Sequence, residues 1–244
     1  MTSKRIFISA DHGLAVVYFL QTDVLQTLLN AGLEVVVLTD DALTEKIGQQ
    51  FARPGLTVTG LRLDRARAYF ESDHYRSQYW LHFLRWMGGS NRVNLNPQIS
   101  HMRQMSYETS RGGKLVLPAI KLAAEVMRRS PAARRMQQRA QNRYVSDIYA
   151  DLFDRYQPDL VVASTPGWRL DRYLLREAAQ RGVRTAAAVI GWDNPSSYRL
   201  PGAPMDAMTC WSQTQKDELV DGSDWNADAV NIGGIPTYDG YFRK

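Results

Sequence analysis

The residues best suited to chemistry stand near the start of the chain, where a strand pattern gives way to a helical one. Residues 5–9 contain a short β-branched and aromatic run, and Asp11, His12 and Gly13 follow it before the helical pattern begins. Because imidazole has an unperturbed pKa of about 6.5, His12 is suited to taking a proton from a hydroxyl group, with Asp11 orienting the ring. The alternative is that Asp11 only caps the helix and His12 is a solvated loop residue.

Two later loops each set a tryptophan beside a glycine and polar residues. Sugar rings are recognised by aromatic faces together with polar side chains, so these loops are candidates for binding a saccharide or another polyol. For the second loop the alternative is a plain turn, because Asp-Asn-Pro is a turn signal. The candidate residues are Thr165, Gly167, Trp168 and Arg169 in the first loop, and Trp192, Asp193 and Asn194 in the second.

Strand and helix patterns alternate around these loops. Residues 33–38 form a nearly continuous hydrophobic run, which is typical of a strand buried on both faces, and the helical spacing of residues 17–28 predicts one helix before it, ending near Gly32. The same alternation predicts a doubly wound, Rossmann-like α/β fold with a parallel sheet of about seven strands. The further strands are expected at residues 56–61, 159–164, 185–190, 207–211 and 229–232.

The segment from about residue 64 to 156 interrupts this alternation and is predicted to be a mostly helical insertion. Within it, Tyr75, Tyr79 and Phe83 lie at helical spacing, which usually indicates a packed core. The alternative is an interfacial helix that enters lipid headgroups. Farther along is a basic block, which indicates either a solvated helix or attraction to an anionic membrane surface or a phosphorylated substrate. The block consists of Arg128, Arg129, Arg134, Arg135, Arg139 and Arg143.

Composition limits the compartment and the cofactors. Cys210 is the single cysteine, so an intramolecular disulfide is excluded, and the first residues carry no signal-peptide segment; we therefore expect a cytoplasmic protein. No apolar run reaches the roughly 20 residues that span a bilayer. Neither a dinucleotide fingerprint, nor a P-loop, nor a metal-ligand spacing is present, so we expect no cofactor and no metal. The net charge of +5 selects no partner by itself, and we expect no nucleic-acid partner.

Three segments near the end of the chain occur in a recognisable order. They are residues 189–195 (VIGWDNP), residues 209–219 (TCWSQTQKDEL) and residues 230–239 (VNIGGIPTYD). This order resembles the end of the N-terminal domain of GT-B glycosyltransferases. The resemblance is strongest to enzymes of bacterial surface-polysaccharide assembly and to relatives that transfer polyol phosphates. It spans about a third of the chain, from residue 159 to residue 239.

The resemblance implies that residues 1–244 form the acceptor-binding half of a glycosyltransferase. The acceptor would be a glycan or lipid-linked molecule, the donor a nucleotide-sugar, and His12 with Asp11 would match the position of the catalytic base. Gly13 and the two tryptophan loops would then contact substrate. Because few residues follow Asp239, we expect the C-terminal donor-binding domain to be absent from this chain and to be supplied by a missing domain or a partner chain.

Two expectations about activity follow. As a complete two-domain assembly the protein would transfer sugars, at a cytoplasmic site or on the inner face of the cytoplasmic membrane, whereas this chain alone would be inactive. The alternative is a noncatalytic binding or scaffold protein that keeps the half-fold without the chemistry.

Overall fold

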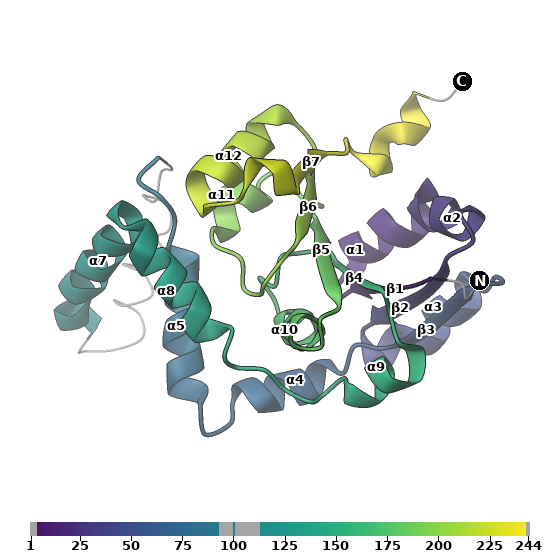
Figure 1. Ribbon diagram of the computed structural model, residues 1–244, viewed down its shortest axis with the longest axis horizontal. Coiled ribbons are helices and arrows are strands. Elements are labelled where there is room, and N and C mark those ends of the chain that lie inside the picture. Colours follow the sequence, from purple (N-terminus) through teal and green to yellow (C-terminus); the bar gives the residue numbers. More distant parts are fainter. Residues whose placement is uncertain (1–3, 93–99, 101–112, 243–244) are drawn as a thin grey trace.

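The computed structural model of the chain describes residues 4–92, 100 and 113–242. Its centre is a seven-stranded sheet in which all neighbouring strands are parallel, with the order β3-β2-β1-β4-β5-β6-β7 (Figure 1). The prediction of a doubly wound α/β fold is therefore confirmed. The strands are β1 (Arg5–Ala10), β2 (Glu34–Thr39), β3 (Leu56–Gly60), β4 (Leu160–Ala163), β5 (Arg184–Ala188), β6 (Ala207–Cys210) and β7 (Val230–Ile232).

Alternate residues of the central strands enter two separate cores, one on each face of the sheet. In β1, Phe7 packs into one core and Ile8 into the other, and both side chains are buried. Burying each such side chain contributes about 1.5–3 kcal/mol, so a strand that is apolar at consecutive positions is stable only between two helical layers. This requirement explains why the strands of this sheet lie between two layers of helices.

The first helical layer covers the Ile8 face. The residues predicted to form one helix instead form α1 (Gly13–Val16), the π-helical turn η1 (Val17–Gln21) and α2 (Asp23–Asn30). The prediction of a single helix was wrong at Thr22, which is extended and accepts a hydrogen bond from the Val24 amide, so it starts a new helix. After β2 come the short 3₁₀ turn η2 (Asp41–Leu43) and α3 (Thr44–Gln50), whose Ile47 packs into the same core.

The opposite face is covered by α10 (Arg172–Gln180) and by helices of the segment between β3 and β4. The described helices of this segment are α4 (Leu63–Phe70), α5 (Tyr75–Met87), α7 (Gly113–Arg129), α8 (Pro131–Gln141) and α9 (Ala150–Tyr156). No strand occurs in its described residues, as expected for a helical insertion. In Figure 1, α9 lies below the sheet, whereas α5, α7 and α8 form a group to one side of it.

The last part of the chain completes the sheet. It contains α11 (Asn194–Tyr198), α12 (Gln213–Ser223) and the 3₁₀ turns η3 (Ala227–Ala229) and η4 (Pro236–Tyr241). Ser212 caps α12 by accepting the Gln215 amide hydrogen. Within the described residues, no helix is both long and apolar enough to cross a membrane.

Strand order places a topological switch point between β1 and β4. The chain leaves β1 towards β2 on one side, and β4 pairs with β1 on the other, with Ser9 opposite Ala163. The loops after β1 and β4 therefore emerge side by side. In open parallel sheets, ligands bind in the crevice at this place.

A close backbone contact holds the loop after β4. The Gly202 amide donates to the Pro166 carbonyl at 2.8 Å, and Gly167 adopts a φ of +76°. A Cβ atom on Gly202 would lie 1.8 Å from the Gly167 carbonyl oxygen. Only glycine at position 202 permits the loop after β4 and the loop that contains Gly202 to lie this close together.

We therefore expect Gly202→Ala to lower the free energy of unfolding by at least about 2 kcal/mol, because the loops must separate to admit the methyl group. Urea denaturation measures this loss. Gly240→Ala is the matched control, since a Cβ there meets no atom within 4 Å, and it should change stability by less than about 0.5 kcal/mol. Equal effects of the two substitutions would contradict the contact.

Candidate active site at the carboxyl ends of β1 and β4

Asp11 is the centre of a polar network that joins the two loops at the switch point. Its side chain is 2% exposed. Oδ1 accepts hydrogen bonds from His12 Nδ1 at 2.6 Å and from Ser164 Oγ at 2.7 Å, and Oδ2 is paired with Arg169 Nε at 2.5 Å. One buried carboxylate thus connects the residue after β1 with two residues after β4.

These partners decide the ionisation of Asp11. Burial would raise the pKa of this carboxyl, but the hydrogen bond and charge of His12, the Ser164 hydroxyl and the charge of Arg169 together lower the pKa below its ordinary value. Asp11 is therefore an ionised carboxylate at neutral pH.

His12 is held in one orientation by Asp11. An ionised carboxylate only accepts hydrogen bonds, so Nδ1 of His12 must carry the hydrogen and donate it. In the neutral ring Nε2 is then the proton acceptor, and the side chain is 25% exposed, so a ligand can reach it. The backbone conformation of His12 is extended, and its carbonyl accepts the Val16 amide hydrogen of α1. This arrangement is that of a general base with an orienting carboxylate.

A second carboxyl group, Asp171, lies at the start of α10 and organises the loop after β4. Its oxygens accept hydrogen bonds from the Thr165 hydroxyl at 2.8 Å and from the Arg169 amide at 3.2 Å. Thr165 in turn accepts the Trp168 amide hydrogen at 3.1 Å. Asp171 therefore positions the backbone of Arg169, whose guanidinium group pairs with Asp11.

The two carboxyl groups differ in their protonation. Complete burial and the nearby charge of Asp11 raise the pKa of Asp171 to about 7, against the opposing effect of the Thr165 hydrogen bond. Two carboxyls in one buried network resist ionising together, so the proton resides on Asp171 below neutral pH while Asp11 keeps its charge. The network then holds one carboxylate between His12 and Arg169.

The sequence candidates are only partly brought together. Asp11, His12, Thr165 and Arg169 meet in this network, with Gly13 starting α1 beside it and Gly167 shaping the loop. Trp168 is buried, with 3% of its surface exposed, so its ring does not offer an open stacking surface.

The second tryptophan loop forms a separate group at the end of β5. Trp192 is 76% exposed, and its carbonyl accepts a hydrogen bond from Gln215 Nε2 at 3.0 Å. Asn194 Oδ1 accepts the Gly191 amide hydrogen at 2.8 Å, so Asn194 orders its own loop, and Asp193 precedes α11 as its N-cap residue. Trp192 is thus an exposed aromatic face at this edge of the sheet that a sugar ring could contact.

Sequence reasoning missed Ser164, Asp171 and Gln215. Ser164 is the last residue of the predicted fourth strand. Asp171 lies two residues beyond the candidate Arg169, and an acidic side chain next to a strand-end loop could have marked it as a site residue. No local pattern marked Gln215, whose role depends on the packing of α12 against the loop after β5.

The described residues contain no group of three or more His, Cys, Asp or Glu side chains that could hold a metal ion. The polar groups of the site are a carboxylate, an imidazole, a guanidinium group and hydroxyls. No model of a known protein family matches the sequence, and no curated protein matches it either.

Asp171 supplies a test of this electrostatic arrangement. Because its folded-state pKa of about 7 is above the ordinary 3.8, its stabilising contribution is complete at low pH and is lost as the pH rises towards 7. Asparagine cannot ionise, so the stability of Asp171→Asn relative to the wild type should rise between about pH 4 and pH 7, by on the order of 1–4 kcal/mol.

Urea unfolding across this pH range makes the measurement. The control is Asp64→Asn, which alters a 99% exposed carboxylate, and its difference from the wild type should stay nearly constant with pH. A constant difference for Asp171→Asn as well would show that Asp171 ionises normally.

Proposed function

We propose that this chain is the acceptor-binding half of a glycosyltransferase that moves a sugar from a nucleotide-sugar donor to a glycan or lipid-linked acceptor, in bacterial surface-polysaccharide synthesis. The observation that carries the proposal is the pairing of buried Asp11 with solvent-accessible His12 at the switch point of the sheet. The resemblance of residues 159–239 to GT-B enzymes supplies the reaction class.

In this proposal an acceptor hydroxyl donates its hydrogen to Nε2 of His12 while its oxygen attacks the anomeric carbon of the donor sugar. The bond between that carbon and the nucleotide phosphate breaks, and the nucleoside diphosphate leaves with the bonding electrons. Asp11 remains ionised and stabilises the imidazolium that forms, and general-base assistance of this kind contributes about 10²- to 10⁴-fold in rate.

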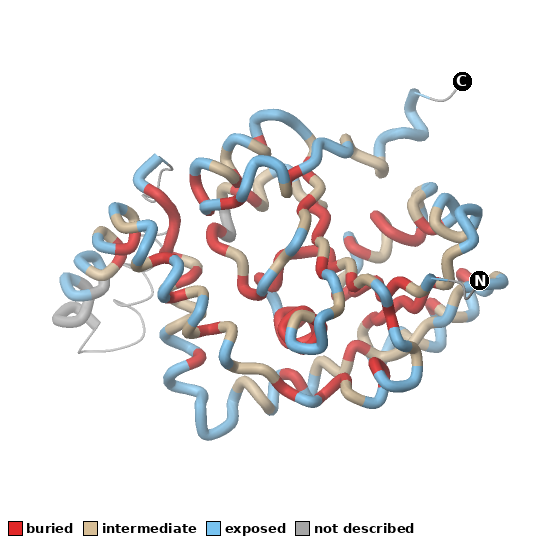
Figure 2. Tube along the Cα trace, viewed as in Figure 1, coloured by how far each residue is buried: buried red, intermediate tan, exposed pale blue. Residues whose placement is uncertain are grey.

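The same edge of the sheet exposes large apolar side chains that a second body would cover. They lie at the end of β7 or in the segments that follow β1, β5 and β7 at the carboxyl edge, and the C-terminal turn is pale blue, meaning exposed, in Figure 2. We propose that the donor-binding domain, within the same protein or on a partner chain, packs here and delivers the nucleotide-sugar. The exposed residues are Leu14, Trp192, Ile232, Tyr238, Tyr241 and Phe242.

Activity tests the assignment of the base. In the complete assembly, purified through a tag on this chain and supplied with a panel of nucleotide-sugars and glycan or lipid-linked acceptors, His12→Ala should lower transfer by about 10²- to 10⁴-fold. Release of nucleoside diphosphate reports the rate. His74→Ala, which alters an exposed histidine before α5, should leave the rate unchanged.

Transfer that survives His12→Ala at the wild-type rate would contradict the proposed base. An assembly that binds acceptor but releases no nucleoside diphosphate with any donor would favour the noncatalytic scaffold.

We also propose that the protein attaches peripherally to a membrane. The sequence offers the aromatic residues of α5 and the basic block as candidates, and Tyr75, Tyr79 and Trp80 of α5 are partly exposed. Helices α7 and α8 add a second surface with exposed Leu122, Val126 and Met136.

The α7–α8 surface is also basic. Glu125 is the one acidic residue between positions 113 and 141, and it is paired with Arg128 and Arg129. The exposed cations next to the apolar residues include Lys121, Arg135 and Arg139. Apolar side chains flanked by Lys and Arg match the interface of an anionic bilayer, where each basic residue contributes about 1 kcal/mol.

Flotation with lipid vesicles tests this surface. The protein should float with phosphatidylcholine vesicles that contain phosphatidylglycerol, and high salt or Leu122→Glu should reduce binding. Leu43→Glu is the matched control, because Leu43 is an exposed leucine in η2, outside the insertion, and it should bind as the wild type does. Binding that is insensitive to anionic lipid, or equal in the two variants, would contradict docking through α7 and α8.

A further inference from the structure

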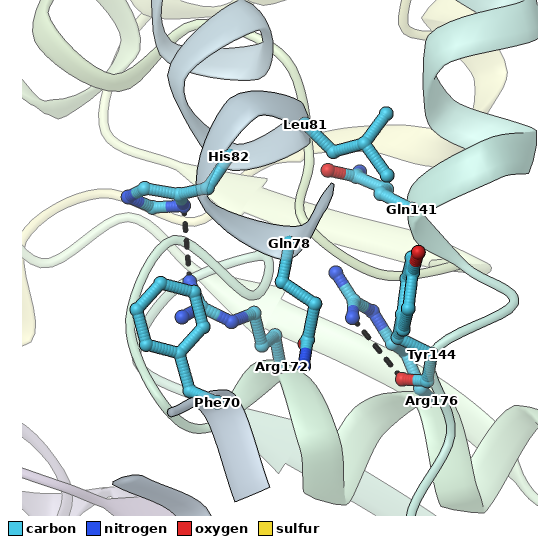
Figure 3. Close-up of a pocket in the computed structure, with 8 residues that line it drawn as sticks. All are labelled: Phe70, Gln78, Leu81, His82, Gln141, Tyr144, Arg172 and Arg176. Carbon is cyan, nitrogen blue, oxygen red and sulfur yellow. Dashed lines mark hydrogen bonds between the residues drawn. The ribbon is translucent and has the colours of Figure 1, made fainter. Parts of the chain in front are cut away.

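A second cluster of buried charges lies between the insertion and α10. Figure 3 shows the cavity at its centre, with Gln78 between Arg172 and Arg176 and with His82 next to Arg172. Arg172 and Arg176 occupy successive turns of α10 and are 6% and 5% exposed. Both charges have therefore been removed almost completely from water.

His82 does not neutralise these charges. Its Nδ1 lies 3.0 Å from a terminal nitrogen of Arg172, and because a guanidinium group only donates, Nδ1 must accept and the ring is neutral. Burial, followed by the charges of Arg85, Arg172 and Arg176, lowers the pKa of His82 to about 2, which agrees with a neutral ring. The histidine thus adds a hydrogen-bond acceptor without adding charge of either sign.

The positive charges of Arg172 and Arg176 are only partly balanced by the groups around them. Arg176 donates to the Gly202 carbonyl at 2.7 and 2.9 Å and to the Tyr144 carbonyl at 3.2 Å, and burial lowers its pKa to about 9. Carbonyl oxygens carry only partial charge. Within the part of the chain that the structure describes, neither Arg172 nor Arg176 forms an ion pair with a carboxylate.

Arg172 is the less satisfied of the two. The one hydrogen bond of its guanidinium group to a described residue is the bond to neutral His82, and its guanidinium carbon lies 5.2 Å from the ring centres of Phe70 and Tyr173. The neighbouring carboxyl group, Asp171, is protonated below neutral pH, because its pKa is raised to about 7. A buried cation with so little compensation is costly unless an anion accompanies it.

The size of the cavity restricts the class of anion. Its free volume is about 10 Å³, close to the minimum that holds one water molecule. A tetrahedral oxyanion such as phosphate would have to displace side chains that are packed between helices, whereas a single halide ion is smaller and requires less displacement of the same side chains.

We propose that this cavity binds one monoatomic anion, with chloride as the physiological occupant, held by the unused N–H groups of Arg172 and by the charge of Arg176. The anion would join α5 of the insertion to α10 of the sheet layer, at the residue next to Asp171. This site is independent of the proposed transferase activity, so either proposal can fail without the other.

Thermal unfolding at fixed sodium concentration tests the site, with sodium chloride replacing sodium glutamate in steps. We expect a saturable rise in Tm of about 2 °C or more in the wild type, because a ligand that binds only the folded state stabilises it. Arg172→Gln should abolish the rise. Arg67→Gln, which alters a largely exposed arginine of α4, should retain it.

A second measurement uses crystals of the wild type soaked in bromide, so it does not require any variant to fold. We expect a peak in the anomalous difference map beside Arg172. A Tm that does not respond to chloride, the absence of a bromide peak, or an Arg172→Gln variant that responds like the wild type would each overturn the site. Stabilisation by sulfate or phosphate at lower concentration than chloride would overturn the assignment to a monoatomic anion.

Discussion

A carboxylate removed from water is stable only if hydrogen bonds and opposite charge replace its hydration, and Asp11 imposes this requirement on the site. Its partners are the imidazole that follows it in sequence and two residues of a loop more than 150 positions away. They meet because β1 and β4 are parallel neighbours in matching register. The chemistry of His12 therefore depends on the pairing of these two strands.

The remaining architecture keeps that pairing in place. Two apolar layers bury both faces of the central strands, and the contact of Gly167 with Gly202 fixes the loop that presents Arg169. Asp171 contributes as a neutral carboxyl that receives hydrogen bonds without adding a second negative charge to the network below neutral pH. The insertion is connected to the same layer through α10, because its N-cap Asp171 belongs to the Asp11 network and its first residue, Arg172, belongs to the cluster at the insertion.

The sheet was predictable from sequence because its strands are short apolar runs, each of which can be recognised from its own residues. The helix break at Thr22 was not predictable, because the helical periodicity of the sequence continues across it. Only the hydrogen bond by which Thr22 caps α2 shows that two helices are present. In the site, strand-end loops identified Asp11, His12 and Arg169, since parallel strands bring such loops to one edge. The burial of Trp168 and the protonation of Asp171 depend on long-range packing, which no local pattern encodes.

The central claim is that Asp11 accepts the Nδ1 hydrogen of His12, which leaves Nε2 as the proton acceptor of the neutral ring. Long-range ¹H–¹⁵N NMR of the histidine side chains identifies the tautomer of His12 directly, with the His12→Ala spectrum providing the assignment. We predict that the neutral ring carries its hydrogen on Nδ1 and leaves Nε2 unprotonated. A neutral ring that carries its hydrogen on Nε2 instead would contradict the account.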